Sequence, residues 1–494
     1  MQVSPNIFRE YDIRGVAGQK FSAAAIAEYE KWYGQFPGIN ITLEVATAIG
    51  RAYGTIIRRA GGREVVIGHE VRPFAEELTN AFIAGVRATG CNVTDLGVCL
   101  TPVVYFATAC GHYDGGANVT GSHNVYFFNG FKLMQRDVWP ISGEALQALR
   151  CLVETEDFLA EPTGEYKKAD GYPEYKRYFL DHVKLTQPLK VVVDCGNGSA
   201  GPFAPDLLRS LGCEVMELYT EPDATFPNHV PDPEDPYMIR DLGRRVREVG
   251  ADLGIGFDAD ADRVGFVTEK GEYVDTDLVL LLLAQDVLQR HPGKKILFEV
   301  KCSELLEKLI PAYGGIPVMG RTGHAPMKIA MRQDSDIILA GEVSGHFFFV
   351  EDYFKFDDGL LAAGRMLELL SRHYGSFSSL FESIPHTVRT PELKLPCADE
   401  VKFDIVRRIT EALSQRYPAV TIDGIRFKPS SASWGLIRAS NTSPYLTIRA
   451  EGATVEEVLK VKNIMADELE QYSAITDCLN RIEVTSHTGR LGWV

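Results

Sequence analysis

The strongest chemical signal in the sequence is a run of three aspartates at alternating positions, Asp258, Asp260 and Asp262, followed by Arg263. Residues two apart share one face of an extended segment, so these carboxylates can converge on one hard cation where the backbone curls. Glu269 lies where an EF-hand needs its last ligand, but Arg263 occupies the position that an EF-hand reserves for glycine. Three oxygen ligands with positions left open favour Mg²⁺ shared with a substrate phosphate, and a solvated acidic turn is the alternative.

A second group of reactive side chains lies near residue 122. Ser122 stands beside His123 and Asn124, and Lys132 follows eight residues after Asn124 in the segment Asn129-Gly-Phe-Lys. Ser122 could act as a nucleophile, and Lys132 could move protons or hold a phosphate. The sequence has no G-x-S-x-G element, which argues against acyl transfer of the hydrolase type. A hydrogen-bonded turn of small polar residues is the alternative interpretation.

Two further segments have polar groups suited to a sugar and to a phosphate. Glu342, Ser344 and His346 follow the apolar segment 337–340 and could bind sugar hydroxyls, which need both donors and acceptors. The segment 438–443, Arg-Ala-Ser-Asn-Thr-Ser, combines a guanidinium, hydroxyls and an amide that could hold a phosphate. Turns that only connect elements are the alternative for both, and no Walker motif is present.

The segments around these loops predict an α/β protein. Apolar β-rich runs alternate with stretches of helical periodicity, and the blocks restart about every 100 residues. Strands are expected at 63–68, 91–97, 189–194, 213–219, 253–257, 264–268, 294–300 and 337–340, and helices at 76–90 and 303–309. The last hundred residues differ, because helices at 401–417 and 455–472 flank extended segments in an α+β pattern. Four domains are therefore predicted, at 1–186, 187–291, 292–392 and 393–494.

Composition limits the possible partners and location. The 494 residues carry a net charge of −16, and an acidic surface repels the phosphates of nucleic acid. The strongest apolar run, 278–284, is far shorter than the roughly 20 residues of a membrane-spanning helix. Nine cysteines without a C-x-x-C pair argue against disulfides and zinc. We expect a cytoplasmic protein without nucleic-acid or membrane partners, and a monomer.

Taken together, these loops resemble those of the α-D-phosphohexomutases, and within them the phosphomannomutase/phosphoglucomutase group. The resemblance covers nearly the whole chain. It is carried by the segments 8–15 (Phe-Arg-Glu-Tyr-Asp-Ile-Arg-Gly), 101–102 (Thr-Pro), 120–124 (Thr-Gly-Ser-His-Asn), 129–132, 226–229 (Phe-Pro-Asn-His), 258–263, 321–324 (Arg-Thr-Gly-His), 341–346, 356–359 (Phe-Asp-Asp-Gly) and 438–442.

The resemblance implies a fold and a reaction. Three related α/β domains in series and a C-terminal α+β domain, similar to TATA-binding protein, would surround a central cleft. Ser122 would be carried as a phosphoserine, and Mg²⁺ would be bound by the seryl phosphate and the three aspartates. The phosphoryl group would pass to a hexose phosphate, giving a bound hexose 1,6-bisphosphate that turns around before Ser122 takes back the other phosphate.

The resemblance also implies roles for single residues. The catalytic candidates are Ser122, His123, Lys132, Arg263 and His324, with Lys132 and His324 as the two candidates for general acid and base. The candidates for substrate binding are Tyr11, Arg14, Lys301, Thr322, Gly323, Glu342, Ser344, His346, Arg438, Ser440, Asn441 and Thr442. The candidates for metal binding are Ser122, Asp258, Asp260 and Asp262.

Three features depart from the family pattern. The usual two prolines after Ser-His-Asn are absent, and residues 125–128 read Val-Tyr-Phe-Phe, which loosens the backbone after Ser122. The usual Gly-Arg-Asp-x-Arg turn is Gly-His-Glu-Val-Arg at 68–72. Residues 28–41 resemble an insertion, whose Tyr29, Trp32, Tyr33 and Phe36 could pack on the domain or form a contact surface.

Two other functions are compatible with the sequence. A phosphoglucosamine mutase is the nearest enzyme, but Val343 resembles the apolar residue of the mannose and glucose group, where the glucosamine group commonly has glutamine. A diverged sugar-phosphate binding protein with little turnover is the other alternative, because the segment after Ser122 is altered. A binding protein, however, gains nothing from a serine that must be phosphorylated.

Overall fold

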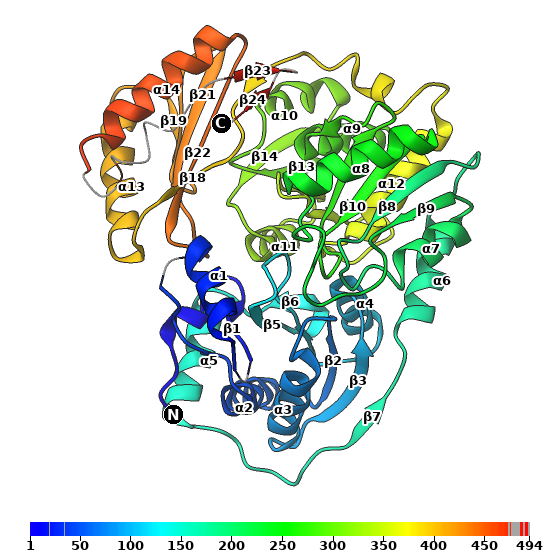
Figure 1. Cartoon of the computed structure of the whole chain (residues 1–494), viewed down its shortest axis with the longest axis vertical. Coiled ribbons are helices and arrows are strands. Elements are labelled where there is room, and N and C mark those ends of the chain that lie inside the picture. Colours follow the sequence, from blue (N-terminus) through cyan, green and yellow to red (C-terminus); the bar gives the residue numbers. More distant parts are fainter. Residues whose placement is uncertain (19, 34, 473–474, 476–484, 488–489, 493–494) are drawn as a thin grey trace.

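The computed structural model describes residues 1–18, 20–33, 35–472, 475, 485–487 and 490–492. In this part of the chain the strands form four sheets, which follow one another along the sequence (Figure 1). The first sheet lies at the bottom of Figure 1, the second and third lie together at the upper right, and the last stands at the upper left. Among the described residues, no helix has both the length and the apolar character that crossing a bilayer requires.

The first unit contains a mixed parallel and antiparallel sheet in the order β1-β5-β4-β2-β3-β7, with β6 paired to β5. Its elements are η1 (Pro5–Ile7), β1 (Ile13–Val16), α1 (Ala23–Tyr33), α2 (Leu43–Arg59), β2 (Glu64–His69), α3 (Ala75–Arg87), β3 (Asn92–Val98), α4 (Thr101–Cys110), β4 (Gly115–Val119), β5 (Phe128–Gln135), η2 (Arg136–Val138), β6 (Trp139–Pro140), α5 (Glu144–Thr155) and β7 (Tyr166–Lys168).

The second and third units contain smaller sheets, in the orders β12-β11-β10-β8-β9 and β14-β13-β15-β16. The elements of the second unit are α6 (Tyr172–His182), β8 (Lys190–Asp194), α7 (Ala204–Leu211), β9 (Glu214–Leu218), α8 (Pro236–Val249), β10 (Leu253–Phe257), β11 (Val264–Thr268), β12 (Tyr273–Val274) and α9 (Thr276–Arg290). Those of the third are β13 (Lys295–Glu299), α10 (Glu304–Leu309), η3 (Pro311–Tyr313), β14 (Ile316–Gly320), α11 (His324–Gln333), β15 (Ile337–Gly341), β16 (Phe347–Phe349), α12 (Gly359–Arg372) and η4 (Ser378–Phe381).

The three units share one plan. In each, a first strand pairs in parallel with a second and a third strand, and a fourth strand pairs antiparallel with the third. The four strands are β2-β3-β4-β5, β8-β9-β10-β11 and β13-β14-β15-β16, with helices before the second and the third strand. The prediction of three related α/β units is confirmed, and so is the hairpin predicted around the three aspartates.

The C-terminal unit is an antiparallel sheet in the order β19-β20-β21-β22-β17-β24-β23, with β18 paired to β22 and one parallel pair, β17 with β24. Its elements are β17 (Val388–Arg389), β18 (Leu393–Pro396), α13 (Asp399–Ser414), β19 (Ala419–Val420), β20 (Ile425–Ser430), β21 (Ser433–Ala439), β22 (Tyr445–Gly452), α14 (Val455–Leu469), β23 (Thr485–His487) and β24 (Arg490–Gly492). The two helices predicted in this part of the chain are α13 and α14.

Apolar packing joins the first three units. One buried cluster combines side chains of α4 in the first unit with side chains of β8–β11, α9, β13 and α12. The C-terminal unit has its own core between its sheet and the helices α13 and α14. Helix starts are fixed by side chains that accept backbone N–H groups, as at Thr42, Asp235, Ser303, Asp358 and Thr454.

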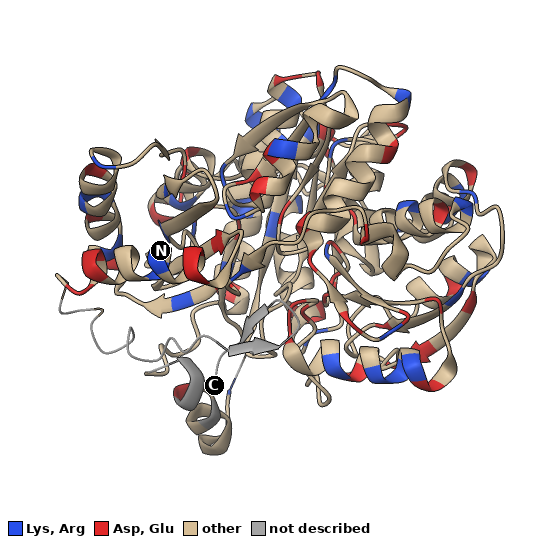
Figure 2. Ribbon diagram, turned by 90° about the horizontal axis from the view of Figure 1, so that it is seen from above, with Lys and Arg blue, Asp and Glu red and all other residues tan. Residues whose placement is uncertain are grey.

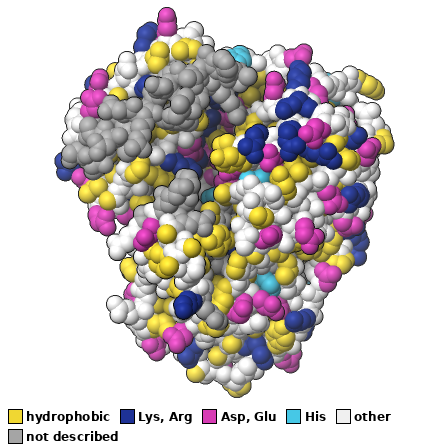
Figure 3. Space-filling view, in the orientation of Figure 1, with side chains coloured by type: hydrophobic (Ala, Val, Ile, Leu, Met, Phe, Trp, Pro, Cys, Tyr) yellow, Lys and Arg dark blue, Asp and Glu magenta, His cyan; other side chains and the backbone are white. Residues whose placement is uncertain are grey.

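Charged residues of both signs alternate along the outer helices, so the negative charge is not concentrated in one described segment (Figure 2). Figure 3 shows a hollow between the C-terminal unit and the units beside it, with acidic and basic side chains inside it. The eight cysteines in the described residues are all unpaired.

Candidate active site

Three of the four chemical segments lie at the same place in their units. Residues 120–127 (the Ser122 loop) connect β4 to β5, residues 258–263 (the aspartate loop) connect β10 to β11, and residues 342–346 (the Glu342 loop) connect β15 to β16. Each loop therefore joins the third strand of its unit to the antiparallel fourth strand. The equivalent ends of the three sheets meet, and this brings together segments that are more than 200 residues apart in sequence.

The loops touch one another directly. Ser122 Oγ lies 3.4 Å from Asp258 Oδ2, which joins the first loop to the second. Val264 N donates to Gly345 O at 3.1 Å, which joins the second to the third. Gly345 has φ +95°, and a Cβ there would lie 2.6 Å from Val264 O, so glycine is required by both its conformation and this contact.

Ser122 is held in an uncommon backbone conformation. Its φ is 52°, its side chain is buried, and its N–H donates to Thr120 Oγ1 at 2.8 Å. The Nδ1 atom of His123 lies 3.4 Å from Ser122 Oγ. Partial burial, together with the nearby Arg263 guanidinium, holds the pKa of His123 well below its usual value, so its ring is neutral at neutral pH. The serine therefore faces the aspartate loop with a neutral imidazole beside it.

The altered turn at 68–72 supports the Ser122 loop. The guanidinium of Arg72 donates to the carbonyl oxygens of Ser122, Asn124, Val125 (2.6 Å) and Phe128 (3.3 Å). Its Nε also donates to Glu70 Oε1 at 2.7 Å, and Glu70 in turn accepts from the N–H of Gly121. Both side chains of this ion pair are fully buried. A single cation thus satisfies several carbonyls in and beside this loop.

Aromatic residues of the segment that lacks the prolines pack against aromatic residues of the insertion in one cluster. Tyr29 packs edge-on against Phe36 and Phe127, with ring centroids at 5.2 and 5.6 Å, and Phe21 lies 5.3 Å from Phe127. Of the two alternatives for the insertion, packing on the domain is therefore correct for Tyr29 and Phe36, while the side chains of Trp32 and Tyr33 lie outside the described residues. This aromatic cluster (Phe21, Tyr29, Phe36, Tyr126, Phe127 and Phe128) covers the back of the Ser122 loop.

The three aspartates of the second loop converge as predicted. Asp258, Asp260 and Asp262 are fully buried, and one carboxylate oxygen from each lies within 4.8 Å of the others. Lys132 donates to Asp260 Oδ2 at 2.8 Å and to Asp262 Oδ2, and Thr101 donates to Asp260 Oδ2 at 2.5 Å. Lys132 of the first unit therefore reaches the aspartate loop of the second.

The donor set of the aspartate loop fits a divalent cation. Oδ1 of both Asp260 and Asp262 is buried without a hydrogen-bond partner among the described residues. Burial, then the charges of Asp260 and Asp262, raise the pKa of Asp258 well above its usual value. Burial also acts against ionisation of Asp260, but Lys132 outweighs it and lowers the pKa of that group. Buried, partly unmatched carboxylate oxygens are the ligands that Mg²⁺ prefers.

A second group of possible ligands, Asp262, His346 and Asp357, is also close together. Arg263 Nε donates to His346 Nε2 at 3.0 Å, so the proton of neutral His346 lies on Nδ1, the atom that would have to bind the metal. Lys328 Nζ lies 2.6 Å from Asp357 Oδ1 and already neutralises that carboxylate. This second group is therefore not a cation site.

The Glu342 loop presents a carboxyl, a hydroxyl and an imidazole. Glu342 is buried, and its Oε1 accepts from the N–H of Gly323. Burial, followed by the neighbouring Glu299, raises the pKa of Glu342 to about 7. Ser344 is half-buried and His346 is buried. A carboxyl near its titration point can both donate to and accept from sugar hydroxyls.

Residues of the first unit also reach this part of the site. Tyr11 Oη donates to Thr322 O at 2.6 Å and accepts from Asn441 Nδ2 at 2.6 Å, so Tyr11 connects three units. Arg14 donates to Thr120 O at 2.5 Å. His324, the first residue of α11, places Nε2 3.2 Å from Asp12 Oδ2.

The C-terminal unit supplies the segment predicted to hold phosphate. Arg438 is buried, and its Nε donates to Asp423 Oδ2 at 3.0 Å. Ser440 Oγ accepts from the backbone N–H groups of Thr442 (3.3 Å) and Ser443 (3.2 Å), which bends residues 440–444, the Ser440 loop, between β21 and β22. Burial acts to lower the pKa of Arg438, but Asp423 outweighs it and raises it, so the guanidinium keeps its charge.

Lys301 lies between the third unit and the C-terminal unit. Its Nζ is 2.7 Å from Glu392 Oε2 and 3.5 Å from Glu299 Oε1. Burial acts to lower the pKa of Lys301, but Glu299 and Glu392 outweigh it, so the ammonium keeps its charge. The structure thus brings the candidates of all four predicted domains to one region.

Several residues of this region were not predicted by sequence reasoning. They are Asp12, Glu70, Arg72, Thr101, Lys328, Asp357 and Asp423. Asp12, Thr101 and Asp357 lie inside segments that carried the family resemblance, which was a usable signal. Phe226, from another such segment, places its ring 4.9 Å from the Arg72 guanidinium. Lys328 and Asp423 stand in no motif, and only the fold reveals them.

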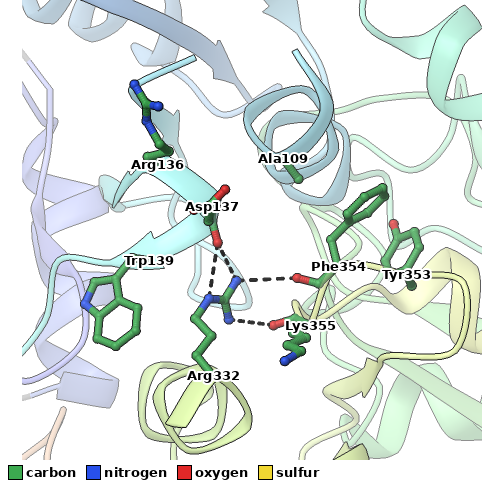
Figure 4. A pocket seen from close by; sticks show the side chains of 8 residues that line it. All are labelled: Ala109, Arg136, Asp137, Trp139, Arg332, Tyr353, Phe354 and Lys355. Atoms are coloured by element: carbon green, nitrogen blue, oxygen red, sulfur yellow. Dashed lines mark hydrogen bonds between the residues drawn. The ribbon is translucent and has the colours of Figure 1, made fainter. Parts of the chain in front are cut away.

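A cavity of about 500 Å³ lies outside this region, between the first and third units (Figure 4). Arg332 projects from α11 into it, and its guanidinium donates to the carbonyl oxygens of Asp137 (2.6 Å), Lys355 (2.9 Å) and Phe354 (3.4 Å). Trp139 and the ring of Phe354 lie on opposite sides of it (Figure 4). The cation of this cavity is therefore used to hold two units together.

Four family models match the chain, one after another along the sequence. The descriptions of the four matching models all read phosphoglucomutase/phosphomannomutase. Alpha/beta/alpha domain I matches residues 5–160, domain II 172–271, domain III 275–388, and the C-terminal domain 392–468.

Individual relatives match over nearly the full length. The chain is 40% identical to a phosphomannomutase/phosphoglucomutase of Pseudomonas aeruginosa, covering 94% of this chain and 95% of that protein. It is 37% identical to a phosphoglucomutase of Neisseria meningitidis, covering 93% and 96%. A crystal structure of a phosphoglucomutase/phosphomannomutase family protein of Burkholderia thailandensis is 36% identical, with a TM-score of 0.85, and covers 95% of this chain and 98% of that one.

Proposed function

The chain belongs to the phosphoglucomutase/phosphomannomutase family, and on this premise we propose that it interconverts hexose 1-phosphates and hexose 6-phosphates of glucose and mannose. It is an intramolecular phosphotransferase of the isomerase class. We propose that Ser122, as a phosphoserine, is the phosphoryl donor, and that a hexose 1,6-bisphosphate is the bound intermediate and the activator.

One observation carries this proposal. Ser122 Oγ lies 3.4 Å from Asp258 Oδ2, beside Thr120, whose hydroxyl donates to Asp260 Oδ2 at 3.0 Å. Lys132 reaches the same aspartates from the first unit. A serine that only closed a turn would have no need of three buried carboxylates and a lysine beside it.

Asp258, Asp260 and Asp262 would hold Mg²⁺ together with the phosphate of Ser122. When bound, this ion would neutralise charge on the phosphoryl group in transfer. The phosphoserine adds a charge of about −1.5 to −2, and the sugar phosphate brings a similar charge, so the cation overcomes repulsion between them.

The protein's own groups would share the remaining work. Arg263 and Lys132 would stabilise the charge of the transferring group, because burial is outweighed by their acidic neighbours and both pKa values are raised. Lys132 therefore suits charge stabilisation better than the role of a base. Because phosphoryl transfer passes through a loose transition state, the sugar hydroxyl keeps its proton until late, and a strong base is not required.

The other two loops would position the substrate. Arg438, Ser440 and the backbone of the Ser440 loop would hold the phosphate that does not react. Glu342, Ser344 and His346 would bind the sugar hydroxyls in either orientation, so the intermediate can turn around and present its second phosphate to Ser122. The bond from phosphorus to Ser122 Oγ breaks in the first half of the cycle and forms again in the second.

The site is complete within one chain, since each of the four domains predicted at 1–186, 187–291, 292–392 and 393–494 supplies one of its loops. We therefore propose that a monomer is sufficient for activity. Unpaired cysteines fit a reducing compartment, and we propose a cytoplasmic location.

The test is mutase activity with Mg²⁺ and a trace of glucose 1,6-bisphosphate. Glucose 1-phosphate, mannose 1-phosphate and glucosamine 1-phosphate are compared, with Ser122→Ala as the control. Turnover of the first two that is lost in Ser122→Ala supports the proposal. Preference for glucosamine 1-phosphate would indicate a phosphoglucosamine mutase instead.

Intact mass separates an enzyme from a sugar-phosphate binding protein. The purified protein, incubated with glucose 1,6-bisphosphate, is expected to carry one phosphate that Ser122→Ala lacks. A folded protein that never gains this phosphate and turns over none of the three sugars would refute the mutase function.

A further inference from the structure

In the third unit, a series of charged and imidazole groups in contact connects His324 and His346. Its centre is a fully buried ion pair in the third unit, in which Lys328 Nζ lies 2.6 Å from Asp357 Oδ1. Lys328 Nζ is also 3.3 Å from His324 Nδ1, and Asp357 Oδ2 is 2.9 Å from His346 Nδ1. One buried pair therefore touches both histidines, whose ring centroids are 5.9 Å apart.

The contacts of His324 define where its proton lies. An ammonium group can only donate hydrogen bonds, so His324 Nδ1 must be an acceptor toward Lys328. The proton of neutral His324 then lies on Nε2, which is 3.2 Å from Asp12 Oδ2 and can donate to this carboxylate. Burial lowers the pKa of Lys328, and Asp357 and the ring of Tyr105, whose centroid is 3.9 Å from Nζ, act in the opposite direction and favour its charged form.

The contacts of His346 define the opposite arrangement. Arg263 Nε donates to His346 Nε2 at 3.0 Å, so Nε2 is the acceptor and Nδ1 carries the proton. Nδ1 faces two carboxylates, Asp357 at 2.9 Å and Asp262 at 3.9 Å, and both can only accept when ionised. His324 and His346 thus carry their protons on different nitrogens: Lys328 sets the choice in His324, and Arg263 sets it in His346, with Asp357 beside the protonated Nδ1.

We propose that Lys328 and Asp357 are positioning residues of the mutase site, which hold His324 as the Nε2–H tautomer and His346 as the Nδ1–H tautomer. Neither residue needs to touch the sugar. Lys328 makes His324 a donor toward Asp12, and this contact ties the third unit to the first beside the Tyr11–Thr322 bond. Asp357 leaves His346 Nε2 free to hold Arg263, which stands at the phosphoryl group.

Stability alone does not explain a buried ion pair at this place. Two apolar residues of similar size would often stabilise a protein as well or better, because removing charges from water is costly. Burial lowers the pKa of Lys328, with Asp357 opposing it, so this cost is present here. Groups that contact the second ring nitrogen of a functional histidine commonly fix its tautomer and its orientation.

The first test reads the tautomers without substrate and without activity. The full-length protein is labelled with ¹⁵N-histidine, and the nitrogens of His324 and His346 are assigned with His324→Gln and His346→Gln. Nitrogens with and without a proton resonate far apart. We expect His324 to have its proton on Nε2 and His346 on Nδ1. Two identical tautomers, or a doubly protonated ring at neutral pH, would overturn the proposal.

Variants then test which groups set the tautomers. In Lys328→Met, His324 loses its donor and is expected to populate the Nδ1–H form. Because each single change leaves a buried charge unpaired, the double variant Lys328→Met/Asp357→Asn is made as well, and it is expected to unfold at a higher temperature than either single variant. If the folded double variant keeps both original tautomers, the proposal is wrong.

Arg332→Met is the matched control. Arg332 lies one turn after Lys328 on α11 and is also a cation with several partners, but these are carbonyl oxygens and not histidines (Figure 4). The ¹⁵N signals of His324 and His346 are expected to stay unchanged in this variant. If they shift as in Lys328→Met, loss of packing around α11 explains both results, and the positioning role is refuted.

The kinetic consequence rests on the proposed mutase function. Loss of a group that positions a functional side chain typically lowers activity by about 10- to 100-fold, so kcat of Lys328→Met is expected to fall within this range. KM should change less, since the Ser440 loop still holds the phosphate. Altered tautomers with unchanged kcat would overturn the positioning role, whereas wild-type tautomers as expected in a protein without mutase activity would refute only the proposed function.

Discussion

The Ser122 loop and the aspartate loop occupy the same place in their units, yet the groups that hold them come from different units. The aspartate loop is held largely from the first unit, where the Thr101 N–H donates to Asp260 O at 3.1 Å and Lys132 donates to the carboxylates of Asp260 and Asp262. The Ser122 loop, at 120–127, is longer and is held within its own unit, by Arg72 and by the aromatic cluster.

The difference follows from what each loop must do. Three carboxylates can be brought together by alternation, but their charge needs a cation and hydroxyl donors, which reach them from the first unit. A serine that is phosphorylated and dephosphorylated must keep its position while its charge changes by about two units. Support from residues that do not themselves change charge can provide that constancy. Equivalent loops of related units can therefore differ in the origin of their rigidity.

The largest effect is expected from a change in the aspartate loop. Asp260→Asn removes one carboxylate charge from the proposed metal site and one partner of Lys132, while Ser122 and the Ser440 loop stay intact. We expect kcat to fall by about 10³-fold and KM to change by less than about threefold, because the lost interaction stabilises charge in the transition state. Steady-state kinetics at several Mg²⁺ concentrations check this.

Asp194→Asn is the control for this variant, because Asp194 is also fully buried at the end of a strand of the same sheet, where it pairs with His229 at 3.1 Å. Its kcat should stay within about threefold of the wild-type value. Equal losses in the two variants would mean that any buried carboxylate of the second unit matters as much as the aspartate loop.

The support of the Ser122 loop is tested with Arg72→Met. The variant removes the donor of several carbonyls and leaves Glu70 buried without its partner, which costs about 3–5 kcal/mol of stability. We expect kcat to fall by about 10²-fold, since a displacement of the nucleophile of about 1 Å has an effect of this size. Thermal unfolding and single-turnover phosphoryl transfer measure the two effects.

The double variant Glu70→Gln/Arg72→Met separates stability from positioning, because it removes the unpaired charge. It should recover part of the stability but little of kcat. Arg87→Met, which removes a donor to Gly164 O from the other end of the same unit, should leave kcat unchanged. If the double variant recovers both properties, Arg72 supports only the fold.

The same comparison explains what could be predicted from the sequence. The aspartate loop was readable because its chemistry and its hairpin both lie in about 15 consecutive residues with period-2 alternation. The β-α-β blocks were readable for the same reason. The strand order that brings the three loops to equivalent positions could not be predicted, since it depends on pairing between segments that are far apart in sequence.

Contacts between segments far apart in the sequence could not be predicted either. The segment 68–72 was noticed only as a departure from a pattern, and nothing in it shows that Arg72 reaches the carbonyls of the Ser122 loop. Tyr29 could equally have packed on the domain or formed a contact surface, because an aromatic side chain suits both places. Lys328 looked like any helical lysine, and only its burial beside Asp357 reveals its position.

The Ser440 loop extends the comparison to a unit with a different fold. Arg438→Ala removes a buried guanidinium that is proposed to bind the phosphate that does not react. Charge-assisted hydrogen bonds contribute about 1.5–3 kcal/mol, so KM is expected to rise by roughly 10- to 100-fold, with kcat reduced much less. Arg416→Ala, at a half-exposed arginine of the same unit, should change neither value. Equal effects of Asp260→Asn and Arg438→Ala on KM alone would refute this division of labour.

The smallest effect is expected from the aromatic cluster, which replaces the missing prolines as the support behind Ser122. Tyr29→Leu removes two edge-on ring contacts, each of which contributes about 0.5–1.5 kcal/mol, so stability should fall by about 1–3 kcal/mol. Because Phe127 belongs to the Ser122 loop, kcat should also fall, by about two- to fivefold, with KM unchanged. Phe158→Leu is the matched control, since Phe158 packs in the first unit away from this loop, 4.7 Å from the Arg51 guanidinium. It should lose similar stability without losing kcat. If both variants lose stability and neither loses kcat, the cluster is ordinary core packing, and Arg72 alone supports the Ser122 loop.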